Sequence, residues 1–579
     1  MTSHDSSTPG ATVIPNTPAS DPSPVQPAAS GRRMRILLAN PQSVLRNDVG
    51  NSVIYDRGFG EHLGIRYLAA VLEREGHYVK IVDCHFEALD RQELEAICCG
   101  ESFDLCGISF VEPLLQQTIS LAQVLREAHP KAVILIGGYG ASFVGTMVMR
   151  RAPGVDAAVL GEAEISLPQI VAALAAGEDW RKLPGLMYLD GDREVKTGPG
   201  KLVDDLDTIP WPRRGALEQY YGQANMLASR GCMAKCSYCS ITELYSQDKE
   251  KVTDGRRVRV RRPEAVVEEM AYLHQHLNIK HFDFLDDNFT EVVRRNKPWA
   301  TRFADEIHRR GLHISFGMQC RAPEIEEDTF RVLHSCGLRI TSLGIETDVD
   351  RVIKLFRKGA TKEGNRRGLN ILKALGIHIF VEMIMLEPTG NLDEVRENIR
   401  FLEEIRITEN YRQPPVCTYR ALALYRGVPI TEQMKALGIV YDDGTLLRYH
   451  FLDPKMERLN ETIEKWLHKS DEVIRLHNGY LHYQASAAGM LTTGLQAVKL
   501  CQEYLEFDLG VYKQAIEFAD MYPQSTADQQ HEFLSRFTGR LSDYIDRYAA
   551  IREKIRGVAL RPTTRTTLRA MTPAPVTNV

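Results

Sequence analysis

Short apolar runs alternate with helical patterns from Arg35 to about Tyr188. The runs are four or five residues long and cover 36–39, 79–82, 105–109, 132–136 and 157–160. Between the first two runs, Leu68, Val71 and Leu72 recur at the spacing of one helix face. Strands that alternate with helices build a parallel sheet covered on both faces. This part of the chain therefore predicts a doubly wound, Rossmann-like α/β domain.

A second alternation follows a proline-rich connector at 209–213. Its candidate strands cover 226–229, 281–284, 313–316, 340–343, 378–381 and 418–424. Repeated strand and helix units of this kind predict a partly closed, parallel (β/α) barrel, in which residues at the strand ends meet at one mouth. We expect the chemistry of the protein at that mouth.

From about Arg448 the pattern is helical throughout. Apolar residues recur at helix spacing, first at Leu459, Ile463, Trp466 and Leu467 and later at Phe533, Phe537 and Leu541. A cap that closes over the barrel and a packing or dimer module both fit this pattern. The predicted division is a disordered tail at 1–33, a first domain at 34–200, a linker at 201–222, a barrel at 223–445, a helical domain at 446–558 and a disordered tail at 559–579.

Composition and charge exclude two classes of partner. The chain has 579 residues and a formal net charge of −5, and nucleic-acid binders need excess lysine and arginine, so we expect no nucleic acid. The arginine-rich run 256–262 instead predicts the solvated face of an edge strand before a helix at Pro263. No stretch reaches the roughly 18 apolar residues of a spanning helix, and the start of the chain lacks a signal-peptide pattern, so we expect no membrane.

Cys232, Cys236 and Cys239 form a C-x3-C-x2-C triplet. Three soft thiolates with no fourth protein ligand are typical of an iron–sulfur cluster with one open iron, whereas zinc and electron-carrier clusters normally take four. The alternative is a loop with three half-buried thiols. The eleven cysteines of the chain show no disulfide-like framework, so we expect a reducing, cytoplasmic compartment.

Small and polar residues follow the strands of the first predicted domain. Ligands of doubly wound sheets bind beyond the carboxyl ends of the strands, and glycine there lets a large flat ligand approach the backbone. The candidate ligand-binding residues at these ends are Asn40, Ser109, Gly137, Gly138, Gly161 and Glu162. From the residues alone, a nucleotide and a flavin fit equally well.

Four segments together resemble one enzyme family. The stretches 136–140, 160–164 and 206–212, followed by the cysteine loop, are similar to the cobalamin-binding branch of the radical S-adenosylmethionine (SAM) enzymes, over roughly residues 35 to 430. The resemblance implies three cofactors, which are a [4Fe-4S] cluster on the three cysteines, cobalamin in its methylcobalamin form and SAM. The residues it assigns to SAM are Tyr238, Asp287, Gln319, Arg321 and Glu346.

The resemblance also bears on the lower face of cobalt. The stretch 83–85 imitates the Asp-x-His motif of other cobalamin proteins, but it follows the second strand and lacks the glycine of that motif, so we expect no protein imidazole on cobalt. Gly64 and Arg66 begin a helix where related enzymes face the lower side of the corrin. Arginine cannot donate a lone pair to cobalt. Arg66 and Glu346 are the candidate catalytic residues, and an arginine here resembles the tryptophan 2-C-methyltransferase type.

One departure from the family pattern lies after the fifth barrel strand. The stretch 382–388 lacks the expected glycines, which permits a nonstandard way of holding SAM.

The predicted function is methyl transfer from SAM through methylcobalamin to a carbon of a small molecule in natural-product biosynthesis, with C2 of tryptophan or another aromatic as one acceptor and an external electron donor. The alternatives are a rearrangement or cyclisation without methyl transfer, and a non-enzymatic cobalamin-binding regulator.

Overall fold

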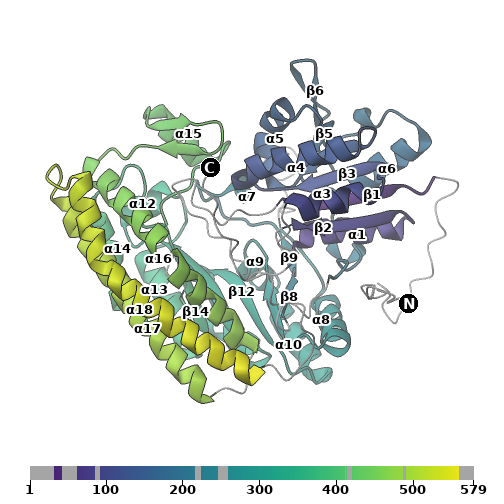
Figure 1. Cartoon of the computed structure of the whole chain (residues 1–579). Helices are drawn as coiled ribbons and strands as arrows, with labels where there is room; N and C mark the ends of the chain where they lie inside the picture. The colour runs from purple at the N-terminus through teal and green to yellow at the C-terminus, as the bar shows by residue number, and fades with distance from the viewer. Residues whose placement is uncertain are drawn as a thin grey trace, which may run out of the picture.

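The computed structural model describes residues 32–41, 61–84, 91–215, 223–244, 258–410, 412–413, 420–486 and 491–559. Figure 1 shows three parts along the chain. These are a first α/β part in purple and blue, a second in teal and green, and long C-terminal helices in green and yellow.

The first part is a seven-stranded sheet in the order β2-β1-β3-β4-β5-β6-β7. Its parallel strands are β1 (Arg35–Asn40), β2 (Tyr78–Asp83), β3 (Leu105–Ser109), β4 (Val133–Gly137) and β5 (Ala157–Val159). Its helices are α1 (Leu63–Arg74), α3 (Arg91–Cys99), α4 (Leu115–Ala128), α5 (Tyr139–Arg151) and α6 (Ser166–Ala176). Leu37 and Leu38, neighbours on β1, belong to separate buried clusters, so both faces of the sheet are covered. The predicted doubly wound fold is confirmed.

The sheet ends in a hairpin that the sequence analysis did not predict. Strands β6 (Leu186–Asp190) and β7 (Arg193–Lys196) are antiparallel, and β6 pairs with β5. Gly191, with φ of 61°, allows the tight turn between them.

The second part is a five-stranded parallel sheet in the order β14-β13-β12-β11-β8. Its strands are β8 (Gln223–Met226), β11 (His281–Phe284), β12 (Ser315–Arg321), β13 (Leu338–Glu346) and β14 (His378–Met383). Its helices are α8 (Pro263–Leu277), α9 (Phe289–Arg295), α10 (Lys297–Arg309), α11 (Glu327–Ser335), α12 (Asp350–Leu355), α13 (Lys362–Ala374) and α14 (Leu392–Glu404). Spatial order equals chain order, as in an open barrel.

The predicted strand positions need three corrections. The first strand ends at Met226, before the expected 226–229, and β12 begins two residues later than expected. Of the expected strand 418–424, residues 418 and 419 lie outside the described part. In the rest only isolated bridges form, from Leu386 to Ala421 and from Leu424 to Leu447.

The arginine-rich run forms a buried contact instead of a solvated face. Strand β10 (Arg259–Val260) pairs antiparallel with β9 (Ser229–Arg230), and α8 begins at Pro263 as expected. Arg259 and Arg261 are buried, so that prediction was wrong for these two residues, whereas Arg262 is exposed as predicted. Arg259 and Arg261 can be buried because they pair with Glu162 and Glu269.

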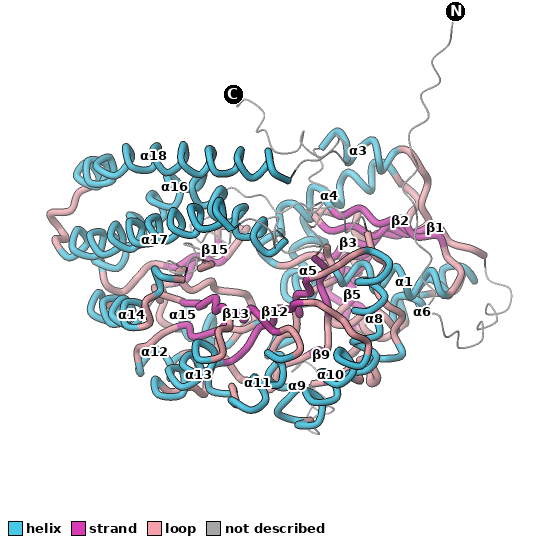
Figure 2. Tube along the Cα trace, turned by 90° about the horizontal axis from the view of Figure 1, so that it is seen from below, coloured by secondary structure: helices cyan, strands magenta, loops and turns pink. Residues whose placement is uncertain are grey.

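The C-terminal part consists of α15 (Pro429–Ala436), β15 (Val440–Asp442), β16 (Leu447–Tyr449), α16 (Pro454–Ser486), α17 (Leu491–Asp520) and α18 (Ala527–Ala559). In Figure 2 the three long helices lie on the side of the second sheet opposite helices α9 to α11. Helix α17 also meets barrel helix α14, where Lys513 pairs with Glu403 at 2.6 Å. Among the described residues, no helix has both the length and the apolar character needed to cross a membrane.

Candidate functional site

The carboxyl ends of the first sheet offer an open, glycine-lined edge. A side-chain carbon added to Gly137 or Gly161 would meet no atom within 4 Å. Gly138 has φ of 81°, and its added carbon would lie 2.8 Å from the backbone oxygen of Phe110 and 2.9 Å from Oγ of Ser109. The Oδ1 atom of Asn40 is buried without a hydrogen-bond partner among the described residues. An open backbone edge with an unused polar atom fits a large ligand such as cobalamin.

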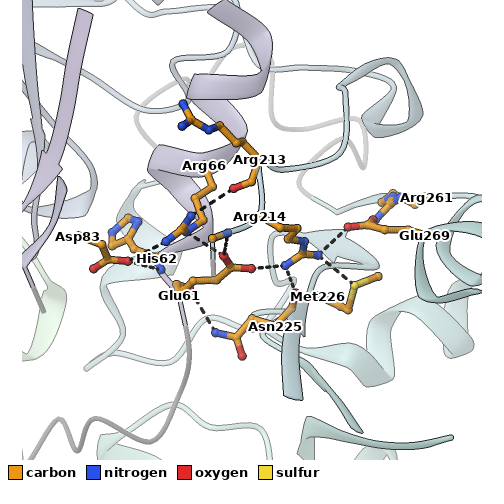
Figure 3. Close-up of polar contacts among 11 residues, drawn as sticks. Glu61, His62, Arg66, Asp83, Arg213, Arg214, Asn225, Met226, Arg261 and Glu269 are labelled. Carbon is orange, nitrogen blue, oxygen red and sulfur yellow. Dashed lines mark hydrogen bonds and ion pairs between the residues drawn. The ribbon is translucent and has the colours of Figure 1, made fainter. Parts of the chain in front are cut away.

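Arg66 lies in the first turns of α1 and is 4% exposed. Its Nε lies 2.9 Å from a carboxylate oxygen of Glu61, and its Nη2 lies 3.7 Å from Asp83. Its Nη1 donates to the backbone oxygen of Arg213 at 3.3 Å. Figure 3 shows the guanidinium between the two acids. Its charge is thus balanced inside the protein, and Arg66 is neither an exposed helix residue nor a lone cation. His85 lies outside the described residues, and Gly64 is exposed on α1.

Glu61 links this contact to the second α/β part. Its other oxygen accepts from Arg214 at 2.6 Å, and Arg214 reaches Glu269 of α8 at 2.7 Å (Figure 3). Glu269 also accepts from Arg261 at 2.8 Å. These side chains are at most 8% exposed. Because a buried charge is stable only when paired, this chain of ion pairs holds the two α/β parts together.

Glu162 makes a second joint between the parts. Its carboxylate accepts two hydrogen bonds from Arg259, at 2.6 and 2.7 Å, and one from the backbone N–H of Val203 at 3.0 Å. Burial alone would raise the pKa of Glu162, but the Arg259 contacts outweigh burial and lower it. The neighbouring Glu164 accepts from Arg230 at 2.6 Å. In this structure Glu162 makes protein contacts, and its predicted contact to cobalamin stays a prediction.

The cysteine loop is anchored by hydrogen bonds at its start and at Ser237. Asp286 accepts from the N–H of Ala228 at 3.1 Å and from Oγ of Ser229 at 2.5 Å, and burial raises its pKa to about 7. Asp287 accepts from the N–H of Gly231 at 2.8 Å. Ser237, inside the loop, donates through Oγ to Leu355 at 2.7 Å. Asp287, predicted to bind SAM, here holds the entrance of the loop.

The three thiols of the loop differ in their surroundings. Cys236 is buried, and Cys232 and Cys239 are half-buried. Burial raises the pKa of Cys232 to about 11 and also raises that of Cys239, so metal binding must displace their protons. Arg321 donates to Sγ of Cys236 at 3.2 Å.

The described residues hold no group of three or more His, Cys, Asp or Glu side chains arranged around a single metal ion. In a four-iron cluster each cysteine binds a different iron, so its thiolates need not converge on one point. Three protein ligands fit a cluster with one open iron, whereas a zinc ion normally takes four.

Glu346 stands at the carboxyl end of β13 with a φ of 68°, beside an irregularity in the β13–β14 register. Its Oε1 accepts from the hydroxyl of Tyr238 at 3.1 Å and pairs with Nζ of Lys358 at 3.0 Å. Burial, followed by the Glu346 charge, raises the pKa of Tyr238 well above its ordinary value. A left-handed conformation is costly for a glutamate, so the structure holds this carboxylate beside the cysteine loop against strain.

Gln319 is exposed on β12, with Ser342 of β13 in register beside it. It thus lies on the accessible face of the barrel sheet, two residues before Arg321 on the same strand. Of the five residues assigned to SAM, the structure brings Tyr238, Arg321 and Glu346 together around the loop through Lys358. Asp287 lies at the start of the loop.

Two family models match the chain. The B12 binding domain model matches residues 53–171, and the Radical SAM superfamily model matches residues 226–402. The chain therefore contains a B12-binding domain and a radical SAM domain. The first match covers the open ends of β3, β4 and β5, and the second covers the cysteine loop, the last residue of β8 and the other four barrel strands. The predicted fold class and the predicted set of cobalamin, iron–sulfur cluster and SAM are confirmed at the level of these domains.

Relatives of this chain include both methyltransferases and cyclases. An uncharacterized methyltransferase of Pyrococcus horikoshii is 28% identical over 76% of this chain and 91% of its own length. The anaerobic magnesium-protoporphyrin IX monomethyl ester cyclase of Rubrivivax gelatinosus is 26% identical over 68% of this chain and 69% of its own length.

Two solved structures share the fold. OxsB, a cobalamin-dependent SAM radical enzyme solved with aqua-cobalamin, has a TM-score of 0.66 and 16% identity, and the match covers 91% of this chain and 80% of OxsB. The methyltransferase TsrM from Kitasatospora setae, solved with cobalamin and a [4Fe-4S] cluster, has a TM-score of 0.57 and 18% identity over 71% of this chain and 76% of TsrM. At these identities the likeness concerns the fold.

Sequence reasoning missed Lys358, Glu61 and Arg214. Glu61 and Arg214 are separated by 153 residues, so no local spacing could pair them. Lys358 follows a short helix without any motif. Only Glu61 could have been noticed from the sequence, because it is an acidic residue five positions before the candidate residue Arg66.

Proposed function

We propose that this protein is a cobalamin-dependent radical SAM methyltransferase that transfers a methyl group from SAM to a carbon of a small molecule in natural-product biosynthesis, with an aromatic acceptor such as tryptophan at C2. When bound, the cofactors supply an electron-rich cobalt and a cluster that reduces SAM. An external electron donor is part of the proposal, as is a reducing cytoplasm.

The observation that supports it best is the Glu164–Arg230 ion pair. Arg230 precedes Cys232 by two residues, and Glu164 follows the open end of β5. The pair, at 2.6 Å, fastens the cysteine loop to the edge of the B12-binding domain. A methyl carrier and a SAM-binding cluster are useful to one substrate only when they share a site.

In this proposal the protein's own residues hold and orient the cofactors. Asn40, Ser109 and the strand-end glycines would hold cobalamin, the three cysteines would hold the cluster, and Glu346 with Tyr238 and Lys358 would bind SAM. Arg66 would face the lower side of the corrin, where it cannot act as a cobalt ligand. Its pairing with Glu61 and Asp83 would fix its position there.

The test is anaerobic reconstitution with iron, sulfide and cobalamin, followed by incubation with a low-potential chemical reductant as the electron donor, methyl-labelled SAM and small aromatic acceptors. We expect labelled product from the wild type and none from the C232A/C236A/C239A variant. Cys99 is exposed and lies outside the loop, so C99S is the matched control and should keep the activity. An unmethylated acceptor with iron and cobalamin fully loaded would contradict methyl transfer.

The second candidate is a rearrangement or cyclisation, which the 26% identity to the magnesium-protoporphyrin ester cyclase favours. It predicts a changed product without label. A cobalamin-binding regulator, the third reading, predicts that the chain takes up cobalamin without iron or sulfide.

A further inference from the structure

One face of the barrel sheet is partly exposed while the other is buried. On β14 the side chains of Ile379, Val381 and Met383 are buried, and the alternate side chains of Phe380 and Glu382 are half-buried. Strands β12 and β13 alternate in the same way, with Gln319 exposed and Ser342 half-buried. This accessible face is the side of the sheet on which a ligand can lie.

A pair of opposite charges lies on the accessible face. Glu382 Oε2 accepts from Nη1 of Arg420 at 3.0 Å, and Glu382 Oε1 accepts from Oγ of Ser342 at 3.0 Å. The side chains of Glu382 and Arg420 are 28% and 38% exposed, so both charges are open to a ligand.

The backbone fixes where the arginine stands. The backbone oxygen of Arg420 accepts from the N–H of Met385 at 2.8 Å, and Leu386 bridges to Ala421 in parallel. Arg420 is thus held at the edge of the sheet beyond β14, next to the C-terminal part of the chain.

The pair is close to the cysteine loop. Arg321, Gly344 and Glu382 occupy the same level on three neighbouring strands. Adjacent strands lie about 4.8 Å apart, so Glu382 is roughly 10 Å from Arg321 along the sheet. Because Arg321 contacts Cys236 at 3.2 Å, a ligand held by the charged pair would extend toward the cluster.

Apolar side chains lie on the same face. Phe380 precedes Glu382 by two residues on β14, Ile340 of β13 is half-buried, and Leu285 at the end of β11 is 37% exposed. A ligand of this face would therefore combine charged groups at the β14 edge with an apolar body along the sheet.

We propose that Glu382 and Arg420 form the substrate site for an α-amino acid with a large apolar side chain. The Glu382 carboxylate would accept from the ammonium group, and the guanidinium of Arg420 would bind the carboxylate through two parallel hydrogen bonds. Without ligand, the two residues neutralise each other. With ligand, one ion pair is replaced by two charge-assisted contacts. This inference rests on the proposed function, since it names the substrate class of that site.

The experiment measures binding, so it is independent of turnover. The reconstituted holoprotein is saturated with S-adenosylhomocysteine, which fills the SAM site, and is titrated by calorimetry with L-tryptophan, N-acetyl-L-tryptophan and L-tryptophanamide. The nineteen other common amino acids are screened in the same way. The variants are E382Q and R420Q, with E382D and R420K as conservative changes. E403Q removes an ion pair on the flank of the barrel and is the matched control.

We expect at least one apolar amino acid to bind, and each of E382Q and R420Q to weaken it by roughly tenfold to a hundredfold. N-acetyl-L-tryptophan should bind the wild type more weakly than L-tryptophan by a similar factor, whereas E382Q should bind the two ligands equally. L-tryptophanamide should likewise bind the wild type more weakly than L-tryptophan, whereas R420Q should bind these two ligands equally. The E382D and R420K variants should retain part of the affinity, and E403Q should retain all of it.

Three results would overturn the inference. They are the absence of binding by all twenty amino acids, equal affinity for the blocked and free ligands, and unchanged affinity in both E382Q and R420Q. Iron and cobalamin content shows that each variant has folded. If amino-acid binding follows the expected pattern but no label is transferred, the proposed methyl transfer fails while this site stands.

Discussion

Gly137 and Gly138 are adjacent in the chain but have different surroundings. Gly138 adopts a left-handed conformation, and a side chain there would collide with backbone at 2.8 Å. Gly137 has free space around it. The first glycine thus leaves room for a ligand, and the second maintains the fold of the turn.

Alanine substitutions should separate these two roles. G138A should destabilise the protein by about 1–3 kcal/mol because of the collision and the unfavourable φ. G137A should leave the unfolding midpoint nearly unchanged but weaken cobalamin binding at least tenfold, the effect of about 1.4 kcal/mol. Thermal unfolding and cobalamin titration measure the two effects. Normal cobalamin affinity in G137A would exclude this edge as the binding surface.

Glu346 shows how a strained residue is held by its partners. Its side chain is 13% exposed and that of Lys358 is 3% exposed, so each is largely removed from water. Removing one partner of such a pair leaves an uncompensated charge, which costs more than the pair itself contributes.

The K358M variant should therefore destabilise the apoprotein by about 3 kcal/mol. The double variant E346Q/K358M should lose less unfolding free energy than the two single variants lose together, with a coupling of roughly 1–3 kcal/mol. Urea unfolding of the four proteins measures this coupling. The K435M variant removes an exposed pair with Glu432 and should cost less than about 1 kcal/mol. Additive single effects would show that the contact does not stabilise the fold.

At the scale of elements, the two α/β parts are joined by buried charges. One joint runs from α1 through Glu61 and Arg214 to Glu269 of α8, and the other links Glu162 to Arg259 of β10. Such joints favour one relative position of the parts, because any other would leave charges buried without partners.

The E61Q variant should lower the stability of this joint by about 3–5 kcal/mol, since it leaves Arg66 and Arg214 with a neutral neighbour. At about 2–4 °C per kcal/mol this corresponds to a fall in the midpoint of roughly 10 °C. The control is E264Q, which breaks an exposed pair with Arg302 at 2.7 Å and should cost about 1 kcal/mol or less. Equal shifts in calorimetry would contradict the role of burial.

Periodicity was sufficient to predict most strands of the two parallel sheets, because it depends on neighbouring residues. Strand β11 and the runs at β1 to β5 lie within one or two residues of their predicted positions. The joints were not predictable, since Glu162 and Arg259 are 97 residues apart. For the same reason Arg259 was assigned to solvent, although it is buried. The cysteine triplet was recognisable because all its ligands lie in one loop.

At the scale of the whole molecule, the C-terminal helices contain a buried histidine. His477 of α16 is fully buried, and its Nδ1 lies 2.8 Å from the hydroxyl of Tyr548 on α18. Burial lowers its pKa from 6.5 to about 4. The folded protein therefore holds the neutral imidazole, and the unfolded chain takes up a proton more readily as the pH falls.

This histidine should make the helical part sensitive to acid. Its contribution to stability is complete above the unfolded pKa, near 6.5, and is lost as the pH falls toward about 4, by roughly 3 kcal/mol in total. In H477Q the unfolding free energy should depend less on pH, because about one proton fewer is taken up on unfolding. H468Q changes an exposed residue of the same helix and should behave as wild type. Urea unfolding between pH 4.5 and 7, monitored by far-ultraviolet circular dichroism, compares the three proteins. A slope for H477Q equal to that of the wild type would mean that other groups cause the acid sensitivity. A flatter slope would identify His477 as the group that couples α16 to α18 only while it is uncharged.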